Sequence, residues 1–355
     1  MRKGWEYKSW ADILTIINGK NQKAVESPNG QYPIYGSGGI MGYALDWLCP
    51  ENCVIIGRKG NINKPLFVES KFWNVDTAFG LSVDQEWLIP KYLFYFCLDY
   101  NFERHNRAVT IPSLTKNDLL KVKMSVPPKS TQLSIVSELD KLNELIRIKK
   151  EQLKDYDTLA QSIFYEMFGD PVENEKGWEV KQLKDVSTLL NGRAYKQHEL
   201  LDKGKYKVLR VGNFFTNSTF YYSDLELDDD KYSEYGDLLF AWSASFGAFI
   251  WNGDKVIYHY HIWKVLFDKD CLDIQYYRYL LNTMTSFFMN DVHGIGMVHL
   301  TKSGMEQYNL PIPPLSLQQS FAQKIEQIEQ QKAAIQKTIT DLETLLAARM
   351  QYWFD

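Results

Sequence analysis

The cysteines and histidines are the residues of this chain best suited to metal or nucleophilic chemistry, and their spacing supports neither. Cys49 and Cys53 form one pair, but no second pair follows at ligand spacing. His259 and His261 would share one face of a strand, again without an evident third ligand. Because a zinc site needs three or four such side chains, we expect no metal site.

Two other segments match catalytic signatures only in part. Residues 36–42 are dense in glycine but lie between short apolar runs, and no Lys-Ser/Thr follows them to bind phosphate, so a tight turn is expected. The Pro-Pro pairs at 127–128 and 313–314 lack the flanking polar and aromatic residues of amino-methyltransferases. We therefore expect a non-catalytic chain that carries no cofactor of its own.

Basic, amide and aromatic residues are gathered in turns, as in proteins that read DNA. Arg and Lys contact phosphates and guanine edges, Asn and Gln read adenine, and aromatic side chains contact methyl groups or act as wedges. The candidate DNA-binding residues of the first half are Lys20, Lys23, Arg58, Lys59, Asn61, Lys64, Arg104 and Arg107. Those of the second half are Arg193, Tyr195, Lys196, Arg210, Asn213, Trp242, Ser243, His293 and Lys302. Any one of them alone is equally a solvated surface residue, so the hypothesis depends on the clusters.

The turns belong to two halves that repeat each other. Gly-Trp-Glu at 4–6 recurs at 177–179 with an offset of 173, whereas the Pro-Pro pair at 127–128 recurs with an offset of 186. The change in offset indicates an insertion within the second copy. Short apolar runs separated by turn residues predict mostly antiparallel strands, including one continuous strand-like run at 256–267, and hence an α+β fold for each module.

Each half ends in a segment with a heptad pattern, which predicts a long helix of about 55 Å. We expect the two helices to pair as an antiparallel coiled coil with pseudo-twofold symmetry, with Ser130 and Ser316 as N-caps. Lys149, Lys332 and Arg349 interrupt the apolar seam and either fix its register or merely cover its edge. The seam residues expected to hold the pair together are Ile135, Leu139, Leu142, Ile146, Leu153, Ile163, Phe321, Ile325, Ile328, Ile335, Ile339, Leu342 and Leu346.

Length and charge fit this organisation. The 355 residues divide into a first module (1–130), a central helix (131–169), a second module (170–316) and a C-terminal helix (317–355). Net charge is −4, with +4 on the first module and −5 on the second, so affinity for DNA phosphates would depend partly on partner subunits. Four cysteines and no apolar run of about 20 residues predict a cytoplasmic protein.

The order and duplication of these motifs resemble the specificity subunit of a Type I DNA restriction–modification enzyme. Pro-Pro-x-x-x-Gln at 127–132 and 313–318 precedes each long helix. The first module is similar to one type of target recognition domain through residues 32–39, 56–60 and 73–78, and the second is similar to another type through residues 236–239.

The resemblance implies that each module reads one half of a bipartite, asymmetric site in double-stranded DNA. It also implies that the helices set the gap between the halves and bind two methyltransferase subunits, with motor-nuclease subunits as further partners. S-adenosylmethionine, ATP and magnesium would then belong to those partners. Two alternatives stay open: a recognition subunit for a fused nuclease–methyltransferase, and a coiled-coil protein scaffold without DNA contact.

Overall fold

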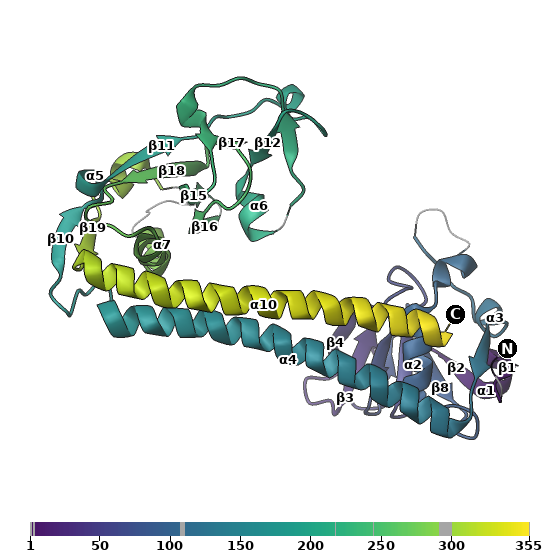
Figure 1. Ribbon diagram of the computed structural model, residues 1–355. Helices are drawn as coiled ribbons and strands as arrows, with labels where there is room; N and C mark the ends of the chain where they lie inside the picture. Colours follow the sequence, from purple (N-terminus) through teal and green to yellow (C-terminus); the bar gives the residue numbers. More distant parts are fainter. Residues whose placement is uncertain are drawn as a thin grey trace. The chain divides into compact units, whose positions relative to one another are not determined.

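The computed structural model describes residues 2, 4–106, 111–216, 218–243, 245–290 and 300–354, and these form two compact units. Unit 1 comprises Met1–Glu151 and Gln336–Asp355, and unit 2 comprises Gln152–Ile335 (Figure 1). Each unit therefore contains one α+β module, the first part of the long helix that follows it and the last part of the other long helix. The compact units thus divide both helices, whereas the segments expected from the sequence kept each helix whole.

The first module contains a large and a small sheet. The large sheet has strand order β2-β8-β5-β6 and the small one β4-β3-β7, and β1 pairs with β9 in front of the long helix. The elements are β1 (Glu6–Ser9), α1 (Trp10–Ile13), β2 (Leu14–Asn18), β3 (Tyr32–Gly36), β4 (Gly39–Ala44), β5 (Cys53–Gly57), β6 (Leu66–Val68), β7 (Trp73–Asn74), β8 (Ala78–Val83), α2 (Pro90–Asp99), η1 (Phe102–His105), α3 (Lys116–Leu119) and β9 (Lys123–Val126).

The second module has the matching sheets β11-β18-β15-β16 and β13-β12-β17-β14, and the pair β10-β19. Its elements are β10 (Glu179–Gln182), α5 (Leu183–Val186), β11 (Ser187–Asn191), η2 (Gln197–Glu199), β12 (Tyr206–Leu209), α6 (Val211–Phe215), β13 (Tyr221–Ser223), η3 (Asp229–Lys231), β14 (Tyr232–Ser233), β15 (Leu238–Ser243), β16 (Ser245–Ile250), β17 (Val256–Tyr258), β18 (Ile262–Phe267), α7 (Ile274–Thr283), α8 (Thr285–Asn290), α9 (Lys302–Met305) and β19 (Asn309–Ile312). The expectation of one strand over 256–267 is wrong, because a turn at 259–261 carries the chain from the sheet of β12 and β17 to the sheet of β15 and β18.

The two modules share one topology. In each, one sheet contains a parallel pair, β3 with β7 or β12 with β17, and the next strand, β8 or β18, joins the other sheet. The expected α+β class with tandem modules is confirmed. The offset between matching residues rises between β12 and β15. In that stretch β13 matches β4, because each pairs with the strand before it, whereas α6, η3 and β14 belong to the insertion indicated by the sequence.

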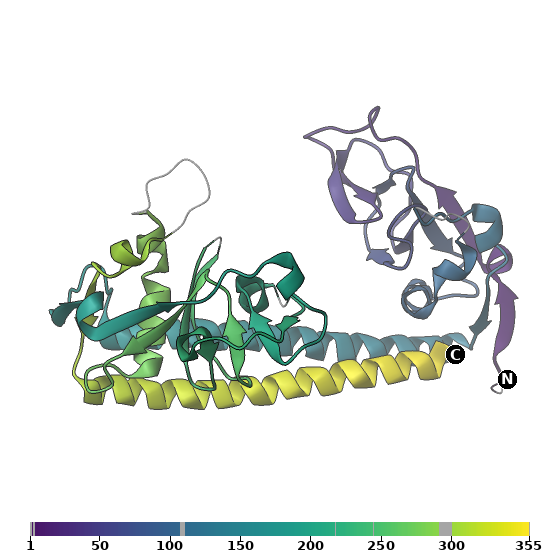
Figure 2. The same ribbon diagram turned by 90° about the horizontal axis from the view of Figure 1, so that it is seen from above.

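The long helices α4 (Lys129–Phe168) and α10 (Leu315–Phe354) run antiparallel within each unit (Figure 2). In unit 1 the Arg349 Nη2 lies 3.0 Å from the Glu138 Oε2. In unit 2 the Lys332 Nζ lies 2.7 Å from the Asp157 Oδ1. Arg349 and Lys332 of the seam thus form ion pairs between the helices, in line with the register role that the sequence left open.

Every seam position lies at least half-buried. Ile135, Leu139, Phe321 and Ile325 are fully buried. The remaining seam residues Leu142, Ile146, Ile328 and Ile339 are buried, and Leu153, Ile163, Ile335, Leu342 and Leu346 are half-buried. The helices therefore satisfy their apolar stripes against each other and against the modules.

A glutamine at the start of each long helix fixes it to its own module. The Gln132 Nε2 donates to the Trp87 and Pro127 carbonyls at 2.8 and 2.9 Å, and its Oε1 accepts from the Ile89 amide at 2.8 Å. The side chain is fully buried. All three of its strong hydrogen bonds go to backbone groups, so it joins the chain before α2 to the start of α4.

Gln318 repeats this arrangement in unit 2. Its Nε2 donates to the Cys271 and Pro313 carbonyls at 2.9 and 2.8 Å, and its Oε1 accepts from the Asp273 amide at 2.8 Å. The glutamine of each Pro-Pro-x-x-x-Gln motif is therefore a structural residue.

The helices begin two residues earlier than the sequence indicated. They start directly after the second proline of each pair, and the carbonyls of Pro128 and Pro314 accept the first helical amides. Ser130 and Ser316 consequently lie inside the first turn and are not N-caps.

Each long helix ends in a phenylalanine that packs on the module of the other repeat. The Phe354 ring lies 5.3 Å from the Tyr92 ring in unit 1, and the Phe168 ring lies 4.6 Å from the Tyr276 ring in unit 2. Tyr92 and Tyr276 are buried on α2 and α7, so the end of one helix completes the core beside the other module.

Candidate nucleic-acid interface

The strands of the large sheet of the first module end, on one side, in a row of turns. Asn18 at the end of β2 pairs with Phe79, and Gly57 at the end of β5 pairs with Ala78. The ends of β2 and β5 therefore meet the start of β8. We call this the loop edge. At the opposite ends of these strands, Leu14 pairs with Val83, and the chain after Val83 leads to the segment that Gln132 fixes to α4. The loop edge therefore lies at the strand ends that are remote from α4.

Basic residues of separate turns meet at the loop edge of the first module. The Lys20 amide donates to the Asn74 carbonyl at 3.0 Å, and the Arg58 amide donates to the Thr77 carbonyl at 2.8 Å. The Arg58 guanidinium lies 5.7 Å from the Phe79 ring and 3.5 Å from the Asp76 carbonyl. Backbone contacts thus bring the predicted Lys20 and Arg58–Lys59 clusters onto one surface.

The second module has the same loop edge. Asn191 at the end of β11 pairs with Trp263, and Ala241 on β15 pairs with Ile262. The Arg193 amide donates to the Tyr258 carbonyl at 3.0 Å, and the Trp242 amide donates to the His261 carbonyl at 3.1 Å.

These backbone bonds establish which residues match. Lys20 corresponds to Arg193, and Arg58 corresponds to Trp242. The Val75 amide donates to the Tyr35 carbonyl, and in the same way the His259 amide donates to the Leu209 carbonyl. The residues that follow these acceptors, Gly36 and Arg210, therefore correspond, and residues 75–77 correspond to 259–261. Gly19 and Gly192 also match, because a Cβ at either would lie 1.8 or 2.4 Å from a carbonyl oxygen of the opposing turn. The two loop edges therefore share a backbone and differ in side chains.

Most of the predicted DNA-binding residues of the first module are exposed. Lys20, Lys23, Lys59, Asn61, Lys64 and Arg104 are exposed and Arg58 is half-buried, whereas Arg107 lies outside the described residues. Arg104 lies on η1. The Phe102 amide of η1 donates to the Asn63 Oδ1 at 2.8 Å, and this bond attaches η1 to the Gly57–Lys64 turn.

In the second module several predicted residues are used within the fold. Arg193 forms a two-pronged ion pair with Glu199 at 2.7 and 3.0 Å, and this pair lowers the pKa of Glu199 to about 2. The Asn213 side chain accepts from the Arg210 amide and donates to the Ser218 carbonyl, both at 2.7 Å.

The other predictions in this module vary in exposure. Ser243 is buried and Tyr195 is half-buried, its pKa raised by desolvation. Lys196 and Arg210 are exposed, Trp242 is half-buried, and the Lys302 Nζ lies 3.7 Å from Glu306. His293 lies outside the described residues.

The turn His259–His261 is a part of the loop edge that sequence reasoning did not assign to DNA. Its rings form a cluster, with 4.8 Å between the two imidazoles and 5.3 Å between His261 and Trp242. Burial, together with nearby His261 and Arg210, lowers the pKa of His259 to about 4, so its imidazole is neutral at pH 7. Two histidines and a tyrosine in three residues were the available signal, but we weighed them only as metal ligands.

Two hollows flank His261. One of about 290 Å³ is lined by Arg210, Val211, Gly212, Asn213, Ser218, Thr219, Tyr221, His259 and His261. The other, of about 620 Å³, is mainly aromatic and is lined by Asn191, Trp242, Tyr260, His261, Trp263, Leu300, Thr301 and Lys302. Hollows with donors and aromatic faces suit the phosphates and bases of a nucleic acid.

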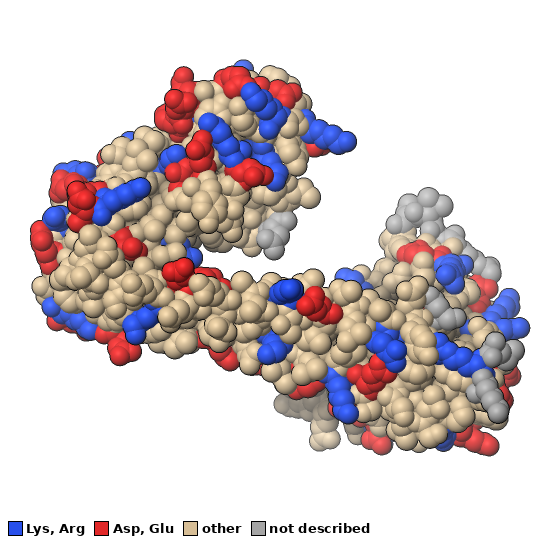
Figure 3. All heavy atoms as spheres, viewed as in Figure 1, with Lys and Arg blue, Asp and Glu red and all other residues tan. Residues whose placement is uncertain are grey.

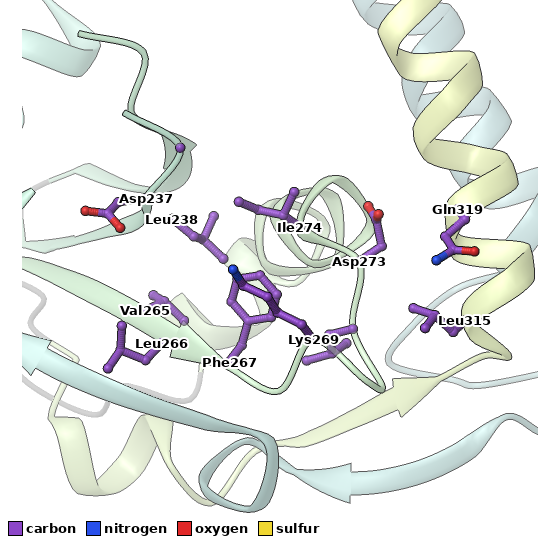
Figure 4. A pocket seen from close by; sticks show the side chains of 12 residues that line it. Asp237, Leu238, Val265, Leu266, Phe267, Lys269, Asp273, Ile274, Leu315 and Gln319 are labelled. Carbon is purple, nitrogen blue, oxygen red and sulfur yellow. The ribbon is translucent and has the colours of Figure 1, made fainter. Parts of the chain in front are cut away.

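A third cavity, of about 390 Å³, lies at the helix side of the second module (Figure 4). Its acidic residues are already engaged, since Asp237 pairs with Lys264 at 2.7 Å and Asp273 caps α7. Gln319 projects toward it from the start of α10. The cavity shows no nucleophile beside a general base.

The described residues contain no cluster of three or more His, Cys, Asp or Glu that could hold a metal ion. Cys49 and Cys53 are buried within the first module, and their mutual hydrogen bond and burial raise the pKa of Cys49.

None of the helices in the described ranges is both long and apolar enough to cross a membrane. Lys and Arg alternate with Asp and Glu on the visible face of the second module (Figure 3), so that face carries no single large basic patch.

Tandem modules with matching loop edges, each followed by a long helix, define a DNA-recognition protein of the restriction–modification class. The chain belongs to the family described as the Type I restriction modification DNA specificity domain, which matches residues 2–155 and 175–344. It is a specificity subunit, as its sequence indicated, and recognises DNA within a Type I restriction–modification complex.

Curated relatives carry the same designation. The Type I restriction enzyme MjaVIII specificity subunit of Methanocaldococcus jannaschii is 22% identical, over 92% of this chain and 86% of the relative. The MjaIX specificity subunit of the same organism is 23% identical, over 82% and 72%.

Two solved structures share the fold. The Type I restriction–modification S subunit from M. genitalium aligns with a TM-score of 0.59 and 14% identity, over 99% of this chain and 96% of that one. A chain from a structure concerning complex assembly and conformational transition of the type I R-M system aligns with a TM-score of 0.63 and 16% identity, over 99% and 97%.

Proposed function

We propose that this subunit reads a bipartite, asymmetric site in double-stranded DNA, one half with each loop edge. The observation that carries the proposal is the backbone match between the edges, combined with the difference in their side chains. Arg58 of the first module has Trp242 as its counterpart, and Gly36 has Arg210. One scaffold with two sets of DNA-contacting groups is suited to two unlike half-sites.

The first module is suited to hydrogen-bonded reading by cations. Arg58, Lys59 and Lys64 follow β5 within one turn, and a guanidinium can bind the O6 and N7 of guanine with two hydrogen bonds. In the second module aromatic rings occupy the same edge, where Trp242 stacks on Trp263 at 5.3 Å. Aromatic and imidazole groups favour contact with methyl groups and base edges.

The outer faces of α4 and α10 are suited to partner subunits. Leu133, Leu145 and Ile148 of α4 are 59, 45 and 39% exposed although the seam is filled. Leu159, Tyr165, Leu345 and Tyr352 extend this set of exposed apolar residues. Apolar residues left outside a completed seam favour association. We propose that two methyltransferase subunits cover them, with motor-nuclease subunits as further partners, and that S-adenosylmethionine, ATP and magnesium bind to those partners.

Mapping of methylated bases by single-molecule sequencing tests the DNA proposal. A strain that carries this gene with its methyltransferase gene should methylate a split sequence with two different halves, and deletion of this gene should abolish that methylation. If the methylation that depends on the gene occurs only in continuous palindromes, the bipartite proposal fails.

Partner binding is tested separately. Leu145→Lys with Ile148→Lys should prevent co-purification with the methyltransferase, because both side chains lie on one face of α4 outside the seam. Lys154→Ala is the control, at an exposed residue on a different face of α4. Unchanged co-purification of the double variant would assign the partner surface elsewhere.

A further inference from the structure

The 290 Å³ hollow beside Arg210 combines a cation with hydrogen-bond donors. It lies between the end of β12, the start of α6 and the His259–His261 turn. Arg210 is exposed, and its guanidinium carbon lies 5.4 Å from the Tyr221 ring. Within the described residues no carboxylate lies within 4 Å of this guanidinium, whereas Arg193 on the same edge is neutralised by Glu199. Arg210 therefore keeps its charge for a ligand.

Two side-chain acceptor atoms of this hollow are already occupied. The Asn213 Oδ1 accepts the Arg210 amide, and the His259 Nδ1 faces the His261 amide at 3.4 Å. With Nδ1 as acceptor, the neutral His259 ring carries its proton on Nε2, which is a donor. Thr219 adds a hydroxyl to the lining. A ligand thus meets donors and a positive charge, and this chemistry fits an anion.

We propose that this hollow binds one phosphate of the DNA backbone in the half-site that the second module reads. The inference rests on the proposed function and assigns to Arg210 a positioning role instead of base reading. Arg-to-phosphate contacts set the register of a protein on the duplex without selecting bases. The site belongs to the second module alone, because Gly36 stands at the matching position of the first.

A base edge is the less suitable ligand. Adenine, cytosine and guanine present at least one donor in a groove, and such a donor needs an acceptor on the protein. The amide of Asn213, the group best able to read adenine here, is held by the Arg210 amide and the Ser218 carbonyl. A phosphate oxygen makes no such demand.

The test compares Arg210→Gln with Lys269→Gln in the complex of the full chain and its methyltransferase. Lys269 is an exposed cation of the same unit at the helix-side cavity. Arg210→Gln should weaken binding to the specific duplex and to an unrelated duplex by the same factor, about 3–10-fold. The slope of log K against log salt should fall in magnitude by about 0.9, the value for one lost phosphate contact. The methylated sequence should stay unchanged, and Lys269→Gln should match the wild type throughout.

Duplexes with single methylphosphonates locate the contact. Neutralising one particular phosphate should weaken the wild-type complex but leave the Arg210→Gln complex unaffected. A changed methylated sequence, an unaltered salt slope, or equal losses in both complexes at every phosphate would each overturn the phosphate assignment. If the wild-type complex itself bound no DNA specifically, the proposed function would fail. If the wild-type complex bound DNA specifically and Arg210→Gln bound it equally well, only the phosphate assignment would fail.

Discussion

Arg58 and Trp242 occupy the same backbone position in the two modules. The carbonyl of Arg58 accepts the Leu114 amide at 2.9 Å, and the carbonyl of Trp242 accepts the Leu300 amide at 3.5 Å. Their own amides donate to the matching residues Thr77 and His261. The guanidinium of Arg58 and the indole of Trp242 are therefore held by the same backbone hydrogen bonds, so the two modules differ in the side chain at this position and not in the backbone that carries it.

The first prediction concerns Arg58→Ala combined with Lys59→Ala. The double variant should lose about 1–3 kcal/mol of binding free energy for the specific duplex, the range for a lost two-pronged base contact. Assembly with the methyltransferase should persist, because both residues lie at the loop edge and remote from α4. Electrophoretic mobility shifts and co-purification measure the two properties.

Lys123→Ala, at an exposed residue of β9, is the control for that experiment and should bind DNA as the wild type does. Undiminished DNA binding by the double variant would favour the scaffold alternative.

The second prediction uses two neighbouring glutamines. Gln318→Leu leaves the Asp273 amide and two carbonyls without their buried partner, and each such loss costs about 1–3 kcal/mol. The unfolding free energy of unit 2 should therefore fall by at least about 3 kcal/mol. Gln319→Leu, at the adjacent exposed residue, should change it by less than about 0.5 kcal/mol. Denaturant unfolding followed by hydrogen exchange in α7 makes the comparison, and equal effects would refute the role of Gln318.

The third prediction concerns acid sensitivity. The pKa of His259 is about 4, below its usual 6.5, because of burial and then His261 and Arg210. The unfolded chain therefore binds the proton more readily, so the contribution of His259 to stability is constant above about pH 6.5 and falls as the pH drops toward 4. Polar groups around this ring include His261, Arg210, Tyr260 and Tyr195.

His259→Asn retains an acceptor near Nδ1 but does not titrate, so thermal unfolding of the variant should decline less between pH 6.5 and 4. His198→Asn, at an exposed histidine of the same module, should keep the wild-type profile. A variant as acid-sensitive as the wild type would show that another group controls this range.

The fourth prediction tests the helices as a ruler. Lys150 and Glu343 lie opposite each other, with 2.7 Å between their charged atoms, so deletion of 147–153 with 340–346 removes matched heptads and keeps the seam in phase. Two turns of helix measure about 10.5 Å. The unread gap should shorten by about three base pairs, at about 3.4 Å each. Methylation mapping reads the gap, and an unchanged length would exclude the ruler.

The long helices and their seam were predictable because a heptad pattern is local and was repeated five times in each copy. The register needed the structure, since Glu138 and Asp157 acquire their roles only from partners some 200 residues away. The same holds for the glutamines: Gln132 was visible as part of a motif, but its three partners were not.

The candidate interface was only partly predictable for the same reason. Turn composition selected Arg58 and Arg210, which the structure leaves on the loop edges, and it also selected Arg193 and Ser243. Arg193 is committed to Glu199 and Ser243 is buried, and neither fact can be derived from local sequence. The shared topology of the modules was obscured by the insertion between β12 and β15.

The phenylalanines that end α4 and α10 have a consequence for inheritance. Phe168 and Phe354 each complete a core beside the opposite repeat, so a genetic exchange that replaced one repeat would also replace the residue that seals its neighbour. An exchanged repeat should therefore fold well with its new neighbour only if its long helix ends in an aromatic residue that packs against the buried tyrosine of that neighbour, Tyr92 or Tyr276.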